Sequence, residues 1–241
     1  MTYETKSEPD PRTGQPVGPK VPDPSPAPRP GPVTLEGRYG RVEKLQPGHA
    51  APLWKFFDGQ PQLWTYIGAY GPFDTYEDFA AHIERFSASP DPYVYAIVDK
   101  DKGPVGYFTL MEIRPQHRVI EVGHVMYSPA LQKSPLATEA QYLLAKYIFE
   151  TLGYRRYEWK CHALNAASRR AGQRFGFSYE GLFRQYLIAK GRNRDNAWFS
   201  MLDSEWPARK ANFEKWLAPG NFTPDGKQKQ SLFALNGGAT A

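Results

Sequence analysis

The sequence predicts a single α/β domain flanked by two polar ends, and three observations support this. Segments with the two-residue period of a strand alternate with helix-spaced apolar segments, in the order strand, two helices, three strands, helix, strand, helix, two strands. Ten of the 23 prolines lie in residues 1–32, and residues 219–241 are polar and rich in glycine. What remains is a core of roughly 175–185 residues, enough for one well-buried domain.

Residues 1–32 contain almost no apolar side chains, so they cannot bury enough surface to offset the entropy lost on ordering. We therefore expect a disordered, proline-rich arm at 1–32, the folded domain at 33–207, and a C-terminal helix or turn with a flexible tail at 208–241. The arm lacks the apolar centre of a signal peptide, and no apolar run is long enough to cross a membrane. These features predict a cytoplasmic protein with no membrane partner.

The composition is basic, with a formal net charge of +5. Such a balance suits nucleic acid or a small polyanionic cofactor alike. Because the basic residues are scattered and no recognition motif occurs, we do not expect nucleic acid as a partner. The single cysteine, Cys161, excludes an internal disulfide, provides no metal cluster and is consistent with a reducing compartment. We expect it to be a small buried residue on a strand, and we expect no metal site.

The first half of the domain is predicted to hold a strand, two helices and two further strands. Apolar residues at helical spacing, such as Leu53 and Phe57, indicate the first helix, and Asp74 or Thr75 can cap the second. A turn ending at Gly103, where a positive φ is favoured, separates the last two strands. The ranges are 33–45 for the first strand, 47–58 and 76–87 for the helices, and 93–98 and 105–113 for the two strands.

An aromatic, turn-rich stretch, Gly59–Phe73, lies between the two helices. It contains Trp64 and Tyr66. Two interpretations stay open: a satellite hydrophobic cluster under a loop, or the wall of a pocket, since pockets are lined mainly by aromatic side chains.

The stretch Val119–Glu139 is the one around which the chain is organised. Alternating, mostly β-branched residues predict a buried strand over Val119–Tyr127, which ends at Ser128-Pro129. Ser134-Pro135 then begins a helix that continues to Leu152, because serine is a favoured N-cap and proline fits the first helical position. The free N–H groups and positive dipole at such a helix start favour a phosphate.

The second half continues with a strand at 155–162, a helix and a closing hairpin. Asn165 is a good N-cap for the helix, which runs through Phe175 and stops at Gly176. The last two strands, at 182–190 and 197–202, surround the turn at 191–196.

Three segments resemble the GNAT acyl-CoA N-acetyltransferases, in particular the RimJ/RimL-like branch. Gln132–Ala137 stands in place of the family's pyrophosphate loop Q/R-x-x-G-x-G/A; Gln132 and Ala137 match, and Pro135 replaces the usual glycine. Residues 165–177 resemble the second signature, N-x-x-S-x-R…GF, and residues 180–184 are typical of the branch. The resemblance covers about 33–207, and it implies the GNAT fold: a mixed, strongly twisted sheet with helices on both faces.

The resemblance also implies a reaction and a cofactor. The chain should transfer an acetyl group from acetyl-CoA to a primary amine, of a small molecule or a protein N-terminus, by direct attack in a ternary complex. The opening strand should part from the next one and bind the pantetheine through its backbone. One arginine among Arg169, Arg170 and Arg174 could meet the 3′-phosphate. The implied cofactor-binding residues are Val125, Met126, Tyr127, Gln132, Lys133, Leu136, Ala137, Thr138, Asn165 and Ser168.

Glu121 and Ser168 are the candidate catalytic residues. Some family members carry a glutamate at the position of Glu121 that deprotonates the amine, and burial between apolar neighbours would raise its pKa toward a useful value. Alternatively, Glu121 only pairs with a basic residue such as Arg184. Ser168 stands where the family protonates the leaving thiolate, or it is a first-turn serine with local hydrogen bonds. By strand period, His124 points away from Glu121 and is interpreted as structural.

The acceptor end is implied to hold the candidate substrate contacts Trp64, Tyr66, Tyr186 and Trp198, of which the last two could equally be core aromatics. The acidic residue that some ribosomal-protein members carry on the penultimate strand is absent around Leu187, which argues against a ribosomal-protein acceptor. A rival hypothesis is a non-catalytic acyl-CoA-binding sensor or scaffold, with Pro135 as its main support. A homodimer, paired through an edge strand or the C-terminal hairpin, is common in such folds.

Overall fold

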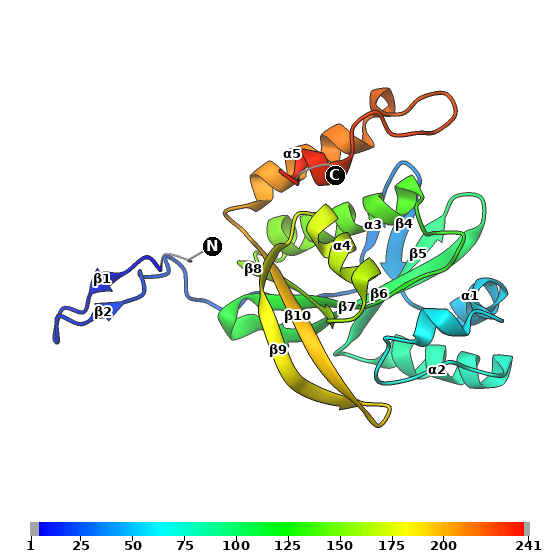
Figure 1. Cartoon of the computed structure of the whole chain (residues 1–241), viewed down its shortest axis with the longest axis horizontal. Helices are drawn as coiled ribbons and strands as arrows, with labels where there is room; N and C mark the ends of the chain where they lie inside the picture. The colour runs from blue at the N-terminus through cyan, green and yellow to red at the C-terminus, as the bar shows by residue number, and fades with distance from the viewer. Residues whose placement is uncertain (1–4, 239–241) are drawn as a thin grey trace.

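The computed structural model describes residues 5–238, so the parts of the predicted arm and tail at 1–4 and 239–241 lie outside the described residues. An eight-stranded sheet carries helices on both faces (Figure 1). Its strand order is β3-β4-β5-β6-β7-β8-β10-β9, and every pair is antiparallel except β7 and β8, which are parallel. The predicted mixed sheet and the predicted element order are both confirmed.

The element bounds lie close to those expected from the sequence. The strands of the large sheet are β3 (Thr34–Glu36), β4 (Gly40–Lys44), β5 (Tyr93–Asp99), β6 (Gly103–Arg114), β7 (Val119–Tyr127), β8 (Arg156–His162), β9 (Ser178–Ala189) and β10 (Arg192–Leu202). The α-helices are α1 (Ala50–Phe57), α2 (Tyr76–Ala88), α3 (Pro135–Lys146), α4 (Ala166–Arg174), α5 (Trp206–Leu217) and α6 (Leu232–Leu235), and a π-helical turn, Tyr147–Thr151, extends α3.

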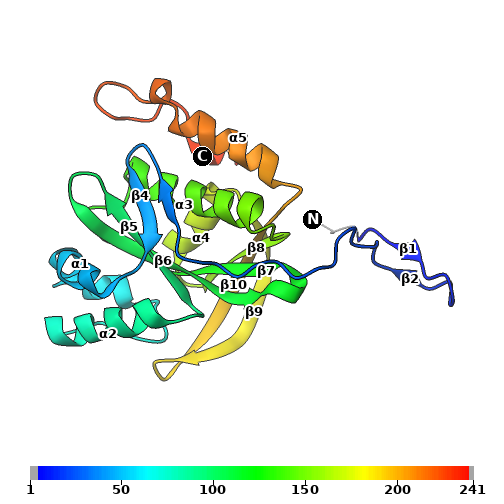
Figure 2. The same ribbon diagram turned by 180° about the vertical axis from the view of Figure 1, so that it is seen from behind.

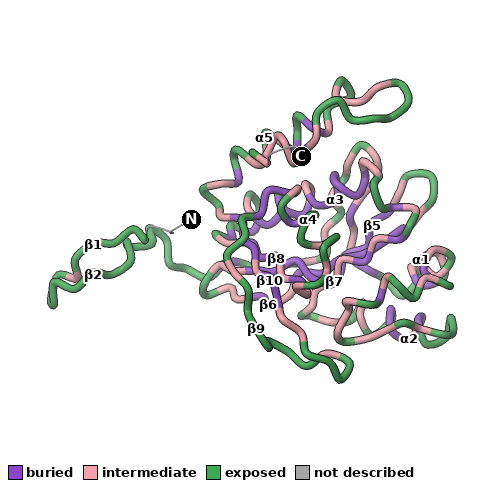
Figure 3. The backbone as a smooth tube through the Cα atoms, viewed as in Figure 1, coloured by how far each residue is buried: buried purple, intermediate pink, exposed green. Residues whose placement is uncertain are grey.

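Two apolar cores lie on opposite faces of the sheet. On one face α1, α2 and the aromatic stretch bury Leu53, Trp64 and Phe79. On the other, α3 and α4 cover the sheet and α5 and α6 pack outside them, and the buried residues include Leu144 and Leu232. Figure 3 shows the buried backbone concentrated in the central strands and α3, with β9 exposed along most of its length. The centre of the sheet is therefore a rigid support for anything that binds beside β7.

The predicted first strand is divided in two by a side chain from α3. The buried carboxylate of Glu139 accepts hydrogen bonds from the amides of Arg38 (2.7 Å) and Tyr39 (2.8 Å). These amides are therefore withdrawn from strand pairing, and the chain turns between β3 and β4. A Cβ on Gly37 would approach the Glu139 carboxylate to 2.4 Å, so a side chain cannot be added there without displacing Glu139.

Residues 23–32, part of the arm expected to be disordered, run back along the folded body (Figure 2). The Gly31 amide donates to the Tyr147 hydroxyl (3.1 Å), and the Tyr95 hydroxyl donates to the Gly31 carbonyl (2.8 Å). Ala27 is buried, and Asp23 pairs with Arg118 (2.6 Å). The composition argument counted only apolar side chains and missed these hydrogen bonds. The small hairpin of β1 (Glu8–Pro9) and β2 (Pro16–Val17) stands away from the body (Figure 1).

The described residues after α5, part of the tail expected to be flexible, also make specific contacts. The Asn221 side-chain amide donates to the carbonyls of Trp216 (3.0 Å) and Gln230 (3.1 Å), which closes a loop. The Trp216 indole donates to the Gln228 side chain (2.7 Å), and Leu232 is fully buried. A few apolar residues in a polar segment are thus enough to anchor it once the main chain is hydrogen-bonded.

Candidate active site

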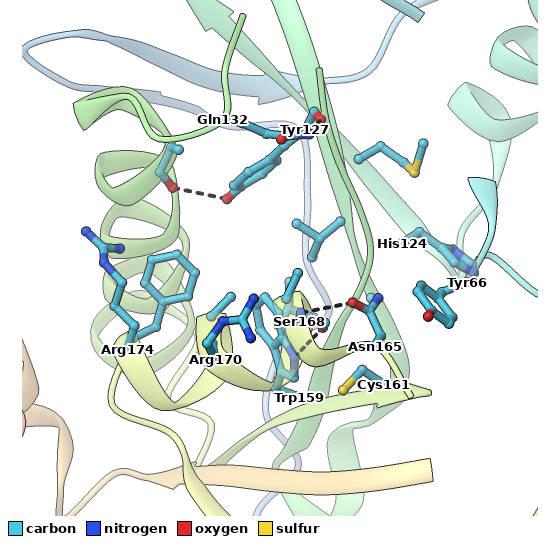
Figure 4. Close-up of a pocket in the computed structure, with 18 of the residues that line it drawn as sticks. Tyr66, His124, Tyr127, Gln132, Trp159, Cys161, Asn165, Ser168, Arg170 and Arg174 are labelled. Carbon is cyan, nitrogen blue, oxygen red and sulfur yellow. Dashed lines mark hydrogen bonds between the residues drawn. The ribbon is translucent and has the colours of Figure 1, made fainter. Parts of the chain in front are cut away.

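The site begins where β7 and β8 separate. Their pairing covers only Val119–Val122 against Arg156–Trp159, so the second half of β7 has no neighbour on that side. A cavity of about 1420 Å³ opens there, bordered by β7, β8, the start of α3, α4, β9 and the segment after α5 (Figure 4). Small-molecule pockets are commonly about 300–1,000 Å³, so this cavity has room for an extended ligand and a second reactant.

The free edge of β7 carries the residues predicted to bind the pantetheine. Val125, Met126 and Tyr127 line the cavity, and Met126 and Tyr127 pair only with β6. The Tyr127 carbonyl accepts from the Gln132 side-chain amide (2.9 Å), and the other backbone groups of this edge have no strand partner on the β8 side, as the resemblance implies. The Tyr127 hydroxyl donates to the Ala137 carbonyl (3.1 Å) and accepts from the Gln141 side chain (3.0 Å), so this strand is tied to α3.

The start of α3 forms one wall of the same cavity. The Ser134 hydroxyl accepts from the Ala137 amide (3.2 Å), as an N-cap does, and Pro135 occupies the first helical position. Gln132, Lys133, Ala137 and Thr138 line the cavity, whereas Leu136 does not and packs in the apolar core. The Ala137 amide, which was expected to donate to the phosphate, therefore already donates to the Ser134 hydroxyl. Proline at this position removes an N–H that the helix itself does not use.

Asn165 and Ser168 meet at the start of α4. The Asn165 side chain accepts from the Ser168 amide (3.0 Å), which confirms the predicted N-cap. The Ser168 hydroxyl accepts from the Trp159 indole (3.1 Å), so its own proton is free for another acceptor (Figure 4). Both residues line the cavity. Cys161 is buried as expected, but it also lines the cavity, and burial raises the pKa of its thiol.

Glu121 is buried in the cavity wall. Burial raises the pKa of its carboxyl group to about 7, against the opposing effect of Lys160, whose Nζ lies 3.0 Å from a carboxylate oxygen. The partner is therefore Lys160 of β8, and not Arg184, which was the sequence-based alternative. A carboxylate poised near neutral pH is suited to accept a proton from an amine.

The interpretation of His124 as pointing away from Glu121 is wrong. Two residues of β7, His124 and Val125, stand opposite Phe108 alone, which is a β-bulge, and His124 has a φ of 44°. The bulge shifts the alternation of β7, so that His124 and Glu121 line the same cavity. Burial, with the nearby charges of Arg194 and Lys160, lowers the pKa of His124 to about 4, and the imidazole is neutral at pH 7.

Two of the four predicted substrate contacts lie at the cavity and two do not. Tyr66 and Tyr186 line it. Trp64 is buried in the core beside α1 and α2, with its ring 5.2 Å from that of Phe73, so the satellite-cluster interpretation holds for it. Trp198 packs against Phe183 (4.8 Å between ring centroids) instead of facing the cavity.

The segment after α5 supplies lining residues that sequence reasoning missed. They are Trp216, Phe222, Gly226, Lys227, Gln228 and Phe233. The available signal was the presence of Phe222, Leu232 and Phe233 in an otherwise polar tail. Arg170 and Arg174 line the cavity too, whereas Arg169 does not. Within residues 5–238 no group of three or more potential ligands could hold a metal ion, and none of the described helices is long and apolar enough to cross a membrane.

Comparison with known proteins gives a consistent result. A family model described as the acetyltransferase (GNAT) domain matches residues 41–178. A GCN5-related N-acetyltransferase from Brucella melitensis is 44% identical, with a TM-score of 0.85, over 88% of this chain and 98% of its own. A probable acetyltransferase (GNAT family) from Chromobacterium violaceum is 39% identical, with a TM-score of 0.75, over 80% of this chain and 98% of its own. No curated protein matches.

The family model spans more than half of the chain, and the sheet, the divided β7–β8 pair and the helix starts have the arrangement that the resemblance implied. The chain therefore belongs to the GNAT acetyltransferase family and is an acyltransferase enzyme.

Proposed function

We propose that this enzyme is an acetyl-CoA-dependent N-acetyltransferase of the RimJ/RimL-like branch, acting on a primary amine of a small molecule or a protein N-terminus by direct attack in a ternary complex. One observation carries the proposal. The cavity where β7 and β8 separate is lined by the start of α3, which suits a phosphate, by the buried carboxylate of Glu121 and by the hydroxyl group of Ser168. The segments at 132–137 and 165–184 support the branch.

Acetyl-CoA supplies the thioester carbonyl that the amine attacks. The free edge of β7 fits the pantetheine amides, and the residues at the start of α3 fit the pyrophosphate. Asn165, which caps α4 in the cavity wall, fits a contact with the pantetheine arm.

Glu121 and Ser168 carry out the two proton transfers of the reaction. Glu121 accepts the proton that the attacking nitrogen must lose, directly or through a water molecule, and Lys160 holds the carboxylate in place. The C–N bond forms as the C–S bond breaks, and the Ser168 hydroxyl donates a proton to the departing sulfur. His124, Tyr66 and Tyr186 border the acceptor side of the cavity.

The rival sensor or scaffold hypothesis is not favoured, because the family model and the similar structures named acetyltransferases support an enzyme. Pro135 occupies the first helical position of α3, where an N–H is dispensable to the helix. We further propose a reducing, cytoplasmic setting, which suits the free thiol Cys161, and we keep a homodimer as a hypothesis that sedimentation would test.

Calorimetric titration of the purified protein with acetyl-CoA tests the proposal first. We expect micromolar binding near one equivalent, followed by release of free thiol when a panel of amines is added. Binding without thiol release from any amine, including N-terminal peptides, would contradict the enzymatic part of the proposal.

A further inference from the structure

The acceptor side of the cavity contains a guanidinium group, that of Arg194. This residue lies on β10, beyond the residues that the family model matches, and it lines the cavity with Tyr66 and His124. Figure 4 places Tyr66 and His124 on the side of the cavity opposite Arg174. Because Arg194 donates a hydrogen bond to the Tyr66 carbonyl, it belongs to this acceptor side.

The side chain of Arg194 is held in one orientation by two hydrogen bonds. Its Nε donates to the side-chain oxygen of the buried Asn196 (2.8 Å), and its Nη1 donates to the Tyr66 carbonyl (3.2 Å). A Cβ on Gly68 would lie only 3.1 Å from Nη1, so the lack of a side chain at Gly68 leaves room for the guanidinium. Nη2 donates to no residue within 5–238, and its N–H groups remain for a ligand.

Arg194 also has no carboxylate partner of its own. It is half-buried, yet it forms no ion pair among residues 5–238. Burial lowers the pKa of Arg194, an effect that the charge of Glu121 opposes, but the Glu121 carboxylate is paired with Lys160 at 3.0 Å. Glu112, the other carboxylate in the described lining, is exposed to solvent. A half-buried guanidinium with a free edge is well suited to bind a carboxylate.

His162 offers a second donor on the same side. Its Nδ1 accepts from the Leu164 amide (3.1 Å), so the neutral imidazole carries its proton on Nε2. Burial and the nearby charge of Arg194 lower the pKa of His162, which keeps the ring neutral at pH 7. The ring lines the cavity and lies 5.2 Å from that of Tyr66. Two neighbouring side chains therefore present N–H groups to an anion.

Apolar side chains form much of the remaining wall on the acceptor side. Leu63 and Ile67 come from the aromatic stretch, and Leu187 of β9 lies directly across from Arg194 in the hairpin. Such a wall fits the apolar part of a small molecule, with the few polar groups fixing its orientation. The acceptor side thus combines a proton acceptor, Glu121, with a site for an anion and an apolar surface.

We infer that the acceptor is a small amine that carries a free carboxylate, such as an apolar amino acid, and that Arg194 binds this carboxylate. A carboxamide, or a protein N-terminus whose first carbonyl is in a peptide bond, offers Arg194 no charge to pair with. The inference rests on the proposed function and narrows it from any primary amine to this class. The reaction is unchanged: the nitrogen gains the acetyl group, Glu121 takes its proton, and CoA leaves as the thiol.

Rates of thiol release from acetyl-CoA with matched acceptors test the inference. Leucine, phenylalanine and β-alanine are each compared with the corresponding carboxamide and with a dipeptide that begins with the same residue. We expect at least one free amino acid to have a kcat/KM at least about tenfold above that of its amide and its dipeptide, because only the acid forms a charge-assisted hydrogen bond with Arg194. Intrinsic reactivity favours the amide, since the carboxylate of an amino acid makes the ammonium group hold its proton more firmly.

Substitutions at Arg194 test its part in this preference. Arg194→Gln should lower kcat/KM for the amino acid about tenfold, mainly through KM, and change that for the amide by less than about threefold. Arg194→Lys, which keeps the charge, should retain part of the preference. Arg192→Gln is the matched control, because Arg192 is an exposed cation of the same strand that does not line the cavity. Thermal unfolding and calorimetry with acetyl-CoA check that each variant folds and binds the donor.

The inference is overturned if the amides or dipeptides react as well as the amino acids, or if Arg194→Gln leaves the preference intact. It is also overturned if Arg194→Gln slows the amino acid and the amide equally, as loss of the contact with Tyr66 alone would do. These results leave the proposed function standing. If Arg194→Gln does not fold, the comparison of acids and amides with the original protein decides the inference.

A binding measurement separates the inference from the proposed function. Calorimetry of the protein saturated with CoA should show that the preferred amino acid binds and that Arg194→Gln weakens this binding about tenfold. Such binding without thiol release from any amine would contradict only the proposed function. Neither binding nor thiol release with any acceptor would end the proposed function and the inference together.

Discussion

At the scale of single residues, Glu121 and Lys160 together set the pKa of the proposed base. Burial alone would push the carboxyl group toward its neutral form, and the ammonium group at 3.0 Å offsets part of that effect. The resulting pKa of about 7 leaves a substantial fraction of the carboxylate charged at neutral pH while keeping it basic. The two residues come from the parallel pair β7 and β8, just before these strands separate.

We predict that kcat/KM rises with pH through about 7, because only the deprotonated carboxylate of Glu121 can accept a proton and its pKa is raised to that value. Glu121→Gln should lower kcat about a hundredfold or more and remove this dependence, with binding of acetyl-CoA unchanged. Initial rates of thiol release from pH 5.5 to 9 measure both effects. Glu84→Gln, an exposed residue on α2, is the control. A normal rate in Glu121→Gln would assign the base to another group.

We predict that Lys160→Met moves the pH profile of kcat/KM toward higher pH. Lys160 lowers the pKa of Glu121, so its removal leaves burial unopposed and the carboxyl group loses its proton later. The same rate measurements detect the shift, with the exposed Lys146→Met as the control. An unchanged profile would mean that the ion pair does not set the titration of Glu121.

At the scale of elements, small departures from regular structure shape the cavity. The bulge in β7 turns His124 toward Glu121, and Ser134 and Asn165 begin α3 and α4 at the cavity wall. The bulge and the two N-caps each place a side chain or a helix start at the cavity between β7 and β8. The helix starts could be predicted because N-caps depend on residues that are neighbours in the sequence. The bulge could not be predicted, because it depends on how β7 pairs with β6.

We predict that Pro135→Gly leaves the affinity for acetyl-CoA within about threefold, since proline at the first helical position removes an N–H that is dispensable to the helix. Stability should fall by about 0.4–1 kcal/mol, because glycine gives the unfolded chain more freedom. Calorimetry and urea unfolding measure the two effects. A tenfold gain in affinity would instead show that the proline restricts cofactor binding.

At the scale of the whole molecule, the arm and the C-terminal segment both complete the domain. Residues 23–32 lie against Tyr95, Tyr147 and Arg118, and the segment after α5 closes over α3 and α4 (Figures 1 and 2). The family domain at 41–178 is thus extended at both ends, by an arm that buries little apolar surface and by a C-terminal part that buries Phe213, Trp216 and Leu232. The arm is held by hydrogen bonds to partners far away in the sequence, whereas the loop after α5 is closed by hydrogen bonds within residues 216–230.

We predict that removal of residues 1–32 lowers Tm by several degrees, because it breaks the hydrogen bonds to Tyr95 and Tyr147 and exposes the surface under Ala27. Removal of residues 1–22 should leave Tm unchanged, since the hairpin stands away from the body. Scanning calorimetry of the two truncated proteins makes the comparison. Equal Tm values would mean that the docked segment adds nothing to stability.

The sequence by itself determined the element order, the helix caps, the position of the helix start proposed to bind phosphate, and the burial of Glu121. These features follow from local periodicity, capping chemistry and a recognisable family pattern. Only the tertiary structure decided that Lys160 is the partner of Glu121, that His124 faces the cavity, that Trp64 and Trp198 do not, and that residues 23–32 and the described segment after α5 pack against the body. The physical reason is that ion pairs, bulges and main-chain hydrogen bonds join residues distant in sequence. A local sequence pattern does not predict which distant residue will be the partner.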